Sequence, residues 1–147
     1  MEDVKNPHKQ NSHRPTIGLL IDWTEEQFHV TLLNGIADLA AERDVNLVCF
    51  EGGGIFSPRK YEAQKNAAYD LVSPENVDGI ILMSSIAHYV DYNTINNFFQ
   101  RFQPLPMVSY AVDVEKIPYV AVDNESGMKD LLVHLIEVHQ FKKFAFI

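Results

Sequence analysis

Cysteine and basic residues are scarce in this 147-residue sequence. With Cys49 alone, no disulfide can form within the chain, and its place in the apolar run 45–50 predicts a buried, reduced thiol. Twelve Lys and Arg face 20 Asp and Glu, which gives a formal net charge of -8. Because phosphate backbones and anionic membranes are bound through clustered cations, we expect no contact with nucleic acid or membrane. A small-molecule effector is the expected partner.

Long hydrophobic runs are also missing. No apolar stretch approaches the roughly 20 residues that span a bilayer. Residues 1–15 are polar and lack the apolar segment and cleavage pattern of a signal peptide. We therefore expect a cytoplasmic protein that begins with a polar, flexible tail.

Alternating strands and helices are the main pattern in the rest of the chain. Apolar residues make up 46% and charged residues 22%, the balance of a folded domain. Short apolar runs predict strands at residues 16–22, 45–50, 77–83, 107–111, 119–122 and 143–147. This alternation predicts an α/β fold, a parallel doubly wound sheet in a Rossmann-like three-layer lobe.

Helix starts and stops are marked by capping residues and prolines. Thr24 with Gln27 forms a capping-box pattern before a helix that runs toward Asp44. The second predicted helix, 58–72, has an apolar face of Tyr61, Gln64, Ala67, Ala68, Leu71 and Val72. Asp91 is expected to cap the third helix and Asn124 the last one.

Candidate binding residues lie where the predicted strands end. In an open parallel sheet, ligands bind beyond the carboxyl ends of the strands. The residues expected there are Asp22, Trp23, Ser84, Ser85, Tyr110 and Asp123, with Phe28 beside them in the first helix. They suit a small polar ligand such as a sugar or nucleoside, stacked on an aromatic ring and hydrogen-bonded by Asp22. The sequence favours a purely structural role about equally. In that case Asp22 and Asp123 would cap the helices that follow them, and Trp23 would only pack against its neighbours.

Catalytic, metal and cofactor patterns are not found. The Gly52–Gly54 run matches no phosphate-binding motif and predicts a flexible loop. His134 and His139 are five residues apart, so they do not share a helix face as metal ligands would. Ser84–Ser85 lacks the nucleophile-elbow pattern, and Met83–Ser84 stands where a phosphoacceptor domain needs an aspartate. We expect no enzyme, no cofactor and no metal.

Three segments together resemble the ligand-sensing core of lactose-repressor (LacI) family regulators and type I periplasmic binding proteins: VDGIILMSS, PLPMVSYAVDVEKIPYVAVDNESGMKDLLVHLIEVH and KKFAFI. The resemblance runs from about residue 16 to residue 147. It implies a sensor in which two similar lobes close on a ligand. Residues 16–140 would form the N-terminal ligand-binding lobe, and 141–147 the first strand of a second lobe absent from this sequence.

The most similar subset is the repressor-type sensor at the N-terminus of bacterial histidine kinases and diguanylate cyclases. It implies an output module in the full-length protein. Family repressors carry a DNA-reading helix-turn-helix before the sensor, whereas only residues 1–15 precede the match here. We therefore expect no DNA-reading head on this chain.

One departure and one alternative complete the expectations. Gln140 stands where the family usually has a glycine in a left-handed turn, at a cost of about 1 kcal/mol. The alternative function is a non-binding scaffold or dimerisation lobe that forms a homodimer. Exposed aromatic residues such as Tyr89 and Tyr92 would favour it.

Overall fold

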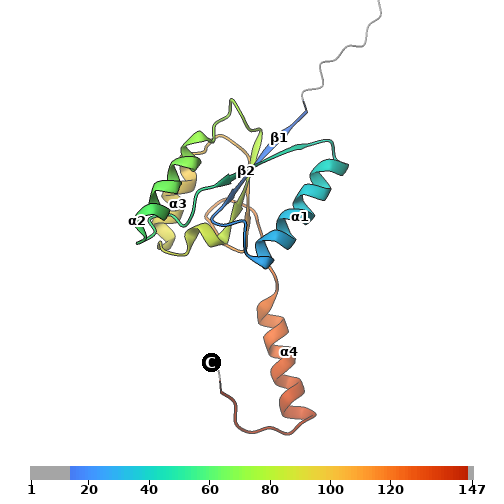
Figure 1. The fold of residues 1–147 in the computed structure, drawn as a ribbon. Helices are drawn as coiled ribbons and strands as arrows, with labels where there is room; N and C mark the ends of the chain where they lie inside the picture. Colours follow the sequence, from blue (N-terminus) through green and yellow to red (C-terminus); the bar gives the residue numbers. More distant parts are fainter. Residues whose placement is uncertain (1–13, 146–147) are drawn as a thin grey trace, which may run out of the picture.

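A five-stranded, all-parallel sheet forms the centre of the computed structural model, which describes residues 14–145 (Figure 1). The strand order is β2-β1-β3-β4-β5. The strands are β1 (Thr16–Ile21), β2 (Asn46–Glu51), β3 (Gly79–Met83), β4 (Met107–Tyr110) and β5 (Tyr119–Val120). Strand order reverses beside β1, because β2 lies on one side of it and β3 on the other. The predicted doubly wound α/β fold is confirmed.

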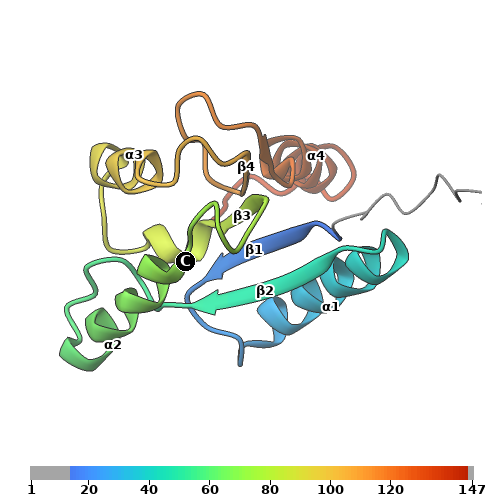
Figure 2. The ribbon, with the colours of Figure 1, turned by 90° about the horizontal axis from the view of Figure 1, so that it is seen from above.

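Helices cover both faces of this sheet, and Figure 2 shows α1 and α3 on opposite sides of the strands. The helical elements are α1 (Gln27–Glu42), α2 (Lys60–Lys65), α3 (Tyr92–Gln100), α4 (Asn124–Glu137) and the 3-10 helices η1 (Asn66–Leu71) and η2 (Ser84–Ala87). Alternate strand residues point to opposite faces. Leu20 and Leu82 enter the core shared with η1 and α3, whereas Leu19 and Ile21 pack with residues of α1.

Two of the predicted helix caps are wrong and one is confirmed. The Thr24 hydroxyl donates a hydrogen bond to the Glu51 carboxylate (2.6 Å), and α1 begins only at Gln27 without a side-chain cap. Asp91 caps α3 as predicted, since its carboxylate accepts the Thr94 N–H (2.8 Å). The cap of α4 is Asp123, one residue before the predicted Asn124.

The second predicted helix is divided into α2 and η1, and its predicted apolar face is mostly wrong, although Val72 is buried as predicted. Tyr61 and Leu71 are largely exposed, while Glu62 and Tyr69 are completely buried. A 3-10 helix has three residues per turn, so the side chains after Lys65 turn differently from those of an α-helix. The rotation lets the Tyr69 hydroxyl reach the carbonyl oxygens of Ile21 (3.0 Å) and Gly53 (2.7 Å).

Cys49 is exposed, so the prediction of a buried thiol is wrong. Its apolar run forms β2, which the strand order places at the edge of the sheet. An edge strand has a neighbour on one side only and loses the cover that a central strand receives.

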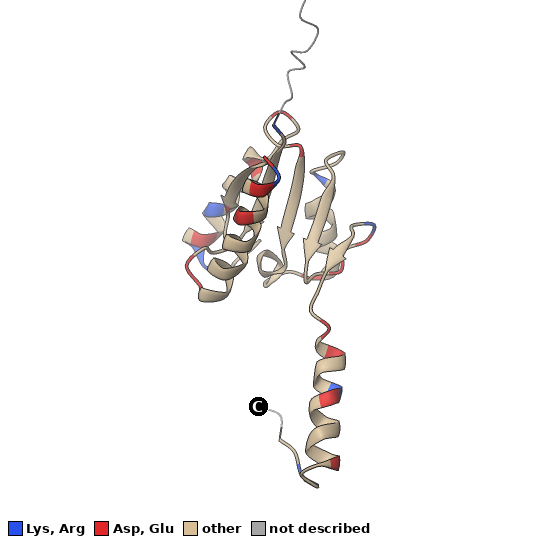
Figure 3. Ribbon diagram, turned by 90° about the vertical axis from the view of Figure 1, so that its right-hand side faces the viewer, with Lys and Arg blue, Asp and Glu red and all other residues tan. Residues whose placement is uncertain are grey.

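Helix α4 stands apart from the sheet in Figures 1 and 3, and none of its residues is buried. Gln140 adopts a left-handed φ of 55°, the conformation in which the resembled family usually has a glycine. Residues 141–145 form no strand, and Phe146 and Ile147 lie outside the described residues. The start of a second lobe at 141–147 stays a prediction, as does the tail, of which 1–13 is not described.

Candidate functional site

A polar cavity of about 420 Å³ opens where strands β1 and β3 end. Its lining comes from the loop after β1, the start of α1, the segment before α2, and the segment after β3. The residues are Asp22, Trp23, Glu26, His29, Arg59, Ser85, His88 and Tyr89. The volume falls within the range of about 300–1,000 Å³ that is usual for small-molecule sites. The cavity lies beside the reversal of strand order, where the sequence predicts a site.

Asp22 is the central acceptor of this cavity. Its Oδ1 atom accepts hydrogen bonds from the Ser85 hydroxyl (2.6 Å) and from the backbone N–H of Trp23 (2.9 Å). These two hydrogen bonds hold the side chain in one orientation. The residue is buried, with 7% of its surface exposed. Among the described residues, no hydrogen bond reaches its Oδ2 atom. A carboxylate fixed in this way has one oxygen ready for a donor such as a ligand hydroxyl.

His29 is the second buried polar group of the cavity. Its Nε2 atom lies 3.9 Å from Asp22 Oδ1, and the residue is 5% exposed. Within the described part of the chain, its Nδ1 atom has no hydrogen-bond partner. A buried polar atom without a partner is costly, by roughly 1–3 kcal/mol. A hydroxyl group or a water molecule in the cavity would remove this cost.

The glycine loop after β2 is packed, contrary to the prediction of a flexible loop. Gly52, Gly53 and Gly54 are all buried. Their backbone N–H groups donate to the Ile21 carbonyl (3.0 Å), to the Asp22 carbonyl (3.2 Å) and to the Glu62 carboxylate (3.2 Å), in that order. Because all three amides have protein partners, the loop does not cradle a phosphate.

Gly54 allows the wall of the cavity to form. A Cβ atom at this position would lie 2.8 Å from Cδ2 of the Tyr89 ring. Only a residue without a side chain lets the ring lie so close to the loop. The Glu62 carboxylate holds the loop from the other side, since it also accepts the Ser57 hydroxyl (2.8 Å).

Trp23 is held at the rim by a chain of charged contacts. Lys65 Nζ lies 4.8 Å from the centroid of the indole ring and 3.3 Å from Glu51 Oε1. The hydrogen bond from Thr24, followed by that from Lys65, lowers the pKa of Glu51 below its ordinary value. Glu51 is therefore ionised at neutral pH and keeps Lys65 over the indole. The cation–π contact fixes one face of the ring.

The structure brings together some of the seven predicted site residues. Asp22, Trp23 and Ser85 line the cavity. Phe28 and Tyr110 lie near each other on the α1 side, with ring centroids 6.2 Å apart, but do not line it. Ser84 is half-buried in η2 and Asp123 caps α4; neither lines the cavity. The ligand contacts of all seven remain predictions.

Five lining residues were missed by the sequence reasoning, namely Glu26, His29, Arg59, His88 and Tyr89. Glu26 precedes α1, and His29 lies in its first turn. Both come close after Asp22 in the sequence, so their position could have indicated that they line the cavity. Arg59 had no such signal, because it reaches the cavity through the folded glycine loop. Tyr89 and Tyr92 are both exposed, as the dimerisation alternative expects, yet Tyr89 also lines the cavity.

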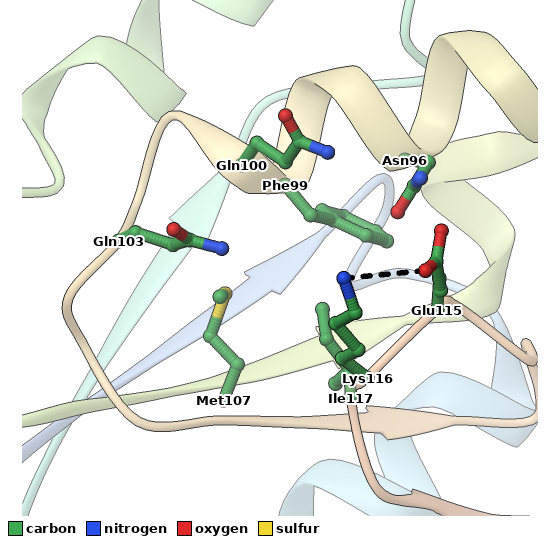
Figure 4. A pocket seen from close by; sticks show the side chains of 8 residues that line it. All are labelled: Asn96, Phe99, Gln100, Gln103, Met107, Glu115, Lys116 and Ile117. Atoms are coloured by element: carbon green, nitrogen blue, oxygen red, sulfur yellow. Dashed lines mark ion pairs between the residues drawn. The ribbon is translucent and has the colours of Figure 1, made fainter.

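A smaller cavity lies between α3 and the segment before β5 (Figure 4). It is lined by Asn96, Phe99, Gln100, Gln103, Met107, Glu115, Lys116 and Ile117. Its volume is about 110 Å³, and the charges of Glu115 and Lys116 pair with each other (3.3 Å). It is too small for a sugar-sized ligand, so the Asp22 cavity is the candidate site.

The fold and this cavity define a parallel α/β lobe with a polar pocket at the carboxyl edge of its sheet. The chain is similar to the ribose operon repressor of Halalkalibacterium halodurans, with 32% identity over 123 residues. The match covers 82% of this chain and 33% of that protein, so the chain spans about a third of the relative's length. No family model matches the sequence. The similarity supports the resemblance to LacI-like regulators, and the relative is named as a repressor and not as an enzyme.

Within residues 14–145, no helix is both long and apolar enough to cross a membrane.

Proposed function

We propose that this chain is the ligand-sensing lobe of a LacI-type regulator or of a bacterial signalling protein, and that it binds a small polyhydroxylated ligand in the Asp22 cavity. The observation that carries the proposal is the pair of buried polar groups with unused hydrogen-bonding atoms, Asp22 Oδ2 and His29 Nδ1. One accepts a hydrogen bond from a ligand hydroxyl. The other donates or accepts, depending on its tautomer.

The cavity also offers the mixed surface that sugars require. Trp23 supplies an apolar ring at the rim, while Glu26, Arg59 and His88 surround it with polar groups. A sugar has apolar C–H faces and polar edges, so it stacks on the ring and hydrogen-bonds to its surroundings. The name of the ribose operon repressor makes ribose the first ligand to test.

Regulation would require a second lobe that closes over this cavity. The ligand then favours the closed state by the difference between its affinities for the closed and the open states. Phe28, Tyr110 and Asp123 would gain contacts only on such closure, because the lobe by itself does not bring them into the cavity. The output, whether kinase, cyclase or DNA-binding module, belongs to the full-length protein.

D-ribose is the probe for the test, followed by xylose, glucose and adenosine. Titration of the chain, followed by two-dimensional amide NMR, should shift the resonances of residues 22–29 and 84–89. The variant Asp22→Asn should raise the dissociation constant at least tenfold, because an amide N–H donor replaces one acceptor oxygen. Asp38→Asn on the exposed surface of α1 is the matched control, and it should bind like the wild type.

Two results would contradict the proposal. Equal binding by the Asp22→Asn variant and the wild type would remove the cavity from the mechanism. Resonance shifts confined to the α3 cavity around Gln100 would move the site elsewhere.

A further inference from the structure

The least exposed part of the Asp22 cavity is rich in hydrogen-bond acceptors. It consists of Asp22, His29 and the half-buried Ser85. Ser85 donates its hydroxyl hydrogen to Asp22 Oδ1 (2.6 Å), so only the lone pairs of its oxygen remain for a ligand. The backbone N–H of Trp23 is used by the same Oδ1 atom (2.9 Å), which leaves Oδ2 as a second acceptor.

His29 adds a third acceptor in the tautomer that its surroundings favour. Its Nε2 atom lies 3.9 Å from Asp22 Oδ1, whereas its Nδ1 atom has no hydrogen-bond partner among the described residues. A hydrogen on Nε2 is attracted by the nearby carboxylate, while a lone pair on Nε2 would be repelled by it. The favoured ring therefore carries its hydrogen on Nε2 and accepts at Nδ1.

Arg59 lines the cavity, but its charge is paired with a residue outside the lining. Its Nη1 atom lies 4.0 Å from Oε2 of Glu62, which is fully buried. Both oxygens of Glu62 accept hydrogen bonds, one from the Gly54 N–H (3.2 Å) and one from the Ser57 hydroxyl (2.8 Å), as those of a carboxylate do. The positive charge of Arg59 therefore offsets Glu62 and not the acids of the lining.

Asp22 and Glu26 give the cavity an excess of negative charge. Both line it, and within residues 14–145 neither forms an ion pair with a lysine or an arginine. The formal net charge of the whole chain, -8 with neutral histidines, adds to the negative potential. A cationic ligand is attracted to such a cavity, and an anionic one is repelled.

We propose that the cavity takes a polyol that carries an ammonium group, the class of the amino sugars, with the ammonium group at Asp22. An ammonium group has three hydrogen-bond donors and no acceptor, which suits a lining of acceptors. A ligand hydroxyl has one donor and turns its own lone pairs toward the remaining acceptors. The bond to the carboxylate is also stronger when the donor is charged. This inference rests on the proposed function and narrows its ligand.

The exposed part of the lining suits the rest of such a ligand. Trp23 supplies an aromatic ring on which the C–H groups of a sugar can pack, and aromatic rings also attract cations. Arg59 and His88 supply N–H donors for the hydroxyl oxygens. Donors therefore lie where the ligand has oxygens, and acceptors lie where it has its ammonium group.

An acidic sugar is the alternative that Arg59 suggests. The side chain of Arg59 is 62% exposed, and a guanidinium group binds phosphates and carboxylates well. Binding them would draw Arg59 away from Glu62 and leave a fully buried carboxylate without its cation, which is costly. The observations therefore favour the cationic ligand, and the test includes an acidic one.

Isothermal titration of the full chain at pH 7 tests the inference with glucosamine, glucose, N-acetylglucosamine and glucose 6-phosphate. Glucosamine should bind at least tenfold more tightly than glucose, because its charge strengthens the hydrogen bond to Asp22. N-acetylglucosamine has the same ring without the charge and should bind no better than glucose. Glucose 6-phosphate should bind most weakly. Added sodium chloride should weaken the binding of glucosamine and leave that of glucose unchanged.

Glu26→Gln is the variant that tests the charge of the cavity. Glu26 is exposed and its side chain forms no cap of α1, so the variant should fold like the wild type. Its affinity for glucosamine should fall severalfold, while its affinity for glucose stays within twofold. Glu25→Gln is the matched control, because the neighbouring Glu25 is also exposed but does not line the cavity. It should bind both sugars like the wild type.

Failure of this inference is distinguishable from failure of the proposed function. Equal affinities for glucosamine and glucose, or tightest binding of glucose 6-phosphate, would overturn the inference and leave a sugar site in the cavity. Binding of D-ribose without binding of glucosamine would do the same. Equal effects of Glu26→Gln and Glu25→Gln would also overturn it, since the charge of the lining would not matter. No binding of any of these sugars would overturn both.

Discussion

At the residue scale, Gly52 lies against the ring of Tyr69 so closely that no side chain fits between them. A Cβ atom at position 52 would lie 2.3 to 2.6 Å from three ring atoms. Tyr69 is fully buried, and its hydroxyl is within hydrogen-bond distance of two carbonyl oxygens, so the ring has little freedom to move. Burial, and then the negative charge of Asp22, raise the pKa of Tyr69. The hydroxyl therefore stays protonated and keeps donating.

Gly52→Ala should accordingly destabilise the fold by about 1–3 kcal/mol, the usual cost of overpacking a core. Urea unfolding followed by fluorescence of Trp23 measures it. Gly35→Ala is the matched control, because a Cβ atom there meets nothing within 4 Å. It should stabilise α1 by about 0.5–1 kcal/mol. Equal effects of the two substitutions would show that the loop yields more easily than its packing implies.

Residues of the cavity differ in how far the sequence predicts them. Asp22, Trp23 and Ser85 follow strands directly, so the rule for parallel sheets finds them. Arg59 depends on the path of the packed glycine loop, and that path depends on the burial of Glu62 and Tyr69. No local sequence pattern predicts that Glu62 is buried and accepts hydrogen bonds from Ser57 and Gly54. The sequence therefore predicts the edge of the sheet that carries the cavity but only part of its lining.

At the element scale, the end of α4 carries a strained residue. Gln140 has a φ of 55°, which costs a residue with a Cβ atom about 1 kcal/mol. Gln140→Gly should relieve this strain and stabilise the helix end by up to about 1 kcal/mol. Thermal unfolding followed by far-ultraviolet circular dichroism measures the gain. Gln140→Ala keeps the Cβ atom and should show none, so equal behaviour of the two variants would refute the argument.

Elements are predicted well where one periodicity runs through them and poorly where it changes. The cap of α3 follows from the local sequence alone. The change from α2 to η1 does not, because it is set by the distant partners of the Tyr69 hydroxyl. Thr24 likewise fits a capping box by sequence, but Glu51 from another strand takes its hydroxyl. Tertiary hydrogen bonds override local preference at both places.

At the scale of the whole molecule, the net charge of -8 opposes association of two copies. A homodimer of this lobe, the alternative function, would have to overcome this repulsion, so screening the charges should strengthen it. Raising sodium chloride from 0.1 M to 1 M shortens the Debye length from about 10 Å to about 3 Å. Sedimentation equilibrium should then show a severalfold tighter dimer. Weakening with salt would instead indicate an interface built on ion pairs.

The overall architecture is the level at which prediction succeeds most fully. Alternating strands and helices determine a parallel sheet, because each crossover must be right-handed and must cover a face. The order of the strands does not follow from this pattern. That order is what places β2 at the edge and exposes its thiol.

The single thiol has a practical consequence for experiments on this protein. Cys49 is accessible on an edge strand, so a spectroscopic label can be attached there without first removing any other cysteine. Partial desolvation, and then the charge of Glu51, raise the pKa of the thiol. Since the thiolate is the reacting form, coupling needs mildly alkaline buffer. A fluorophore at this position would report the approach of a second copy by energy transfer.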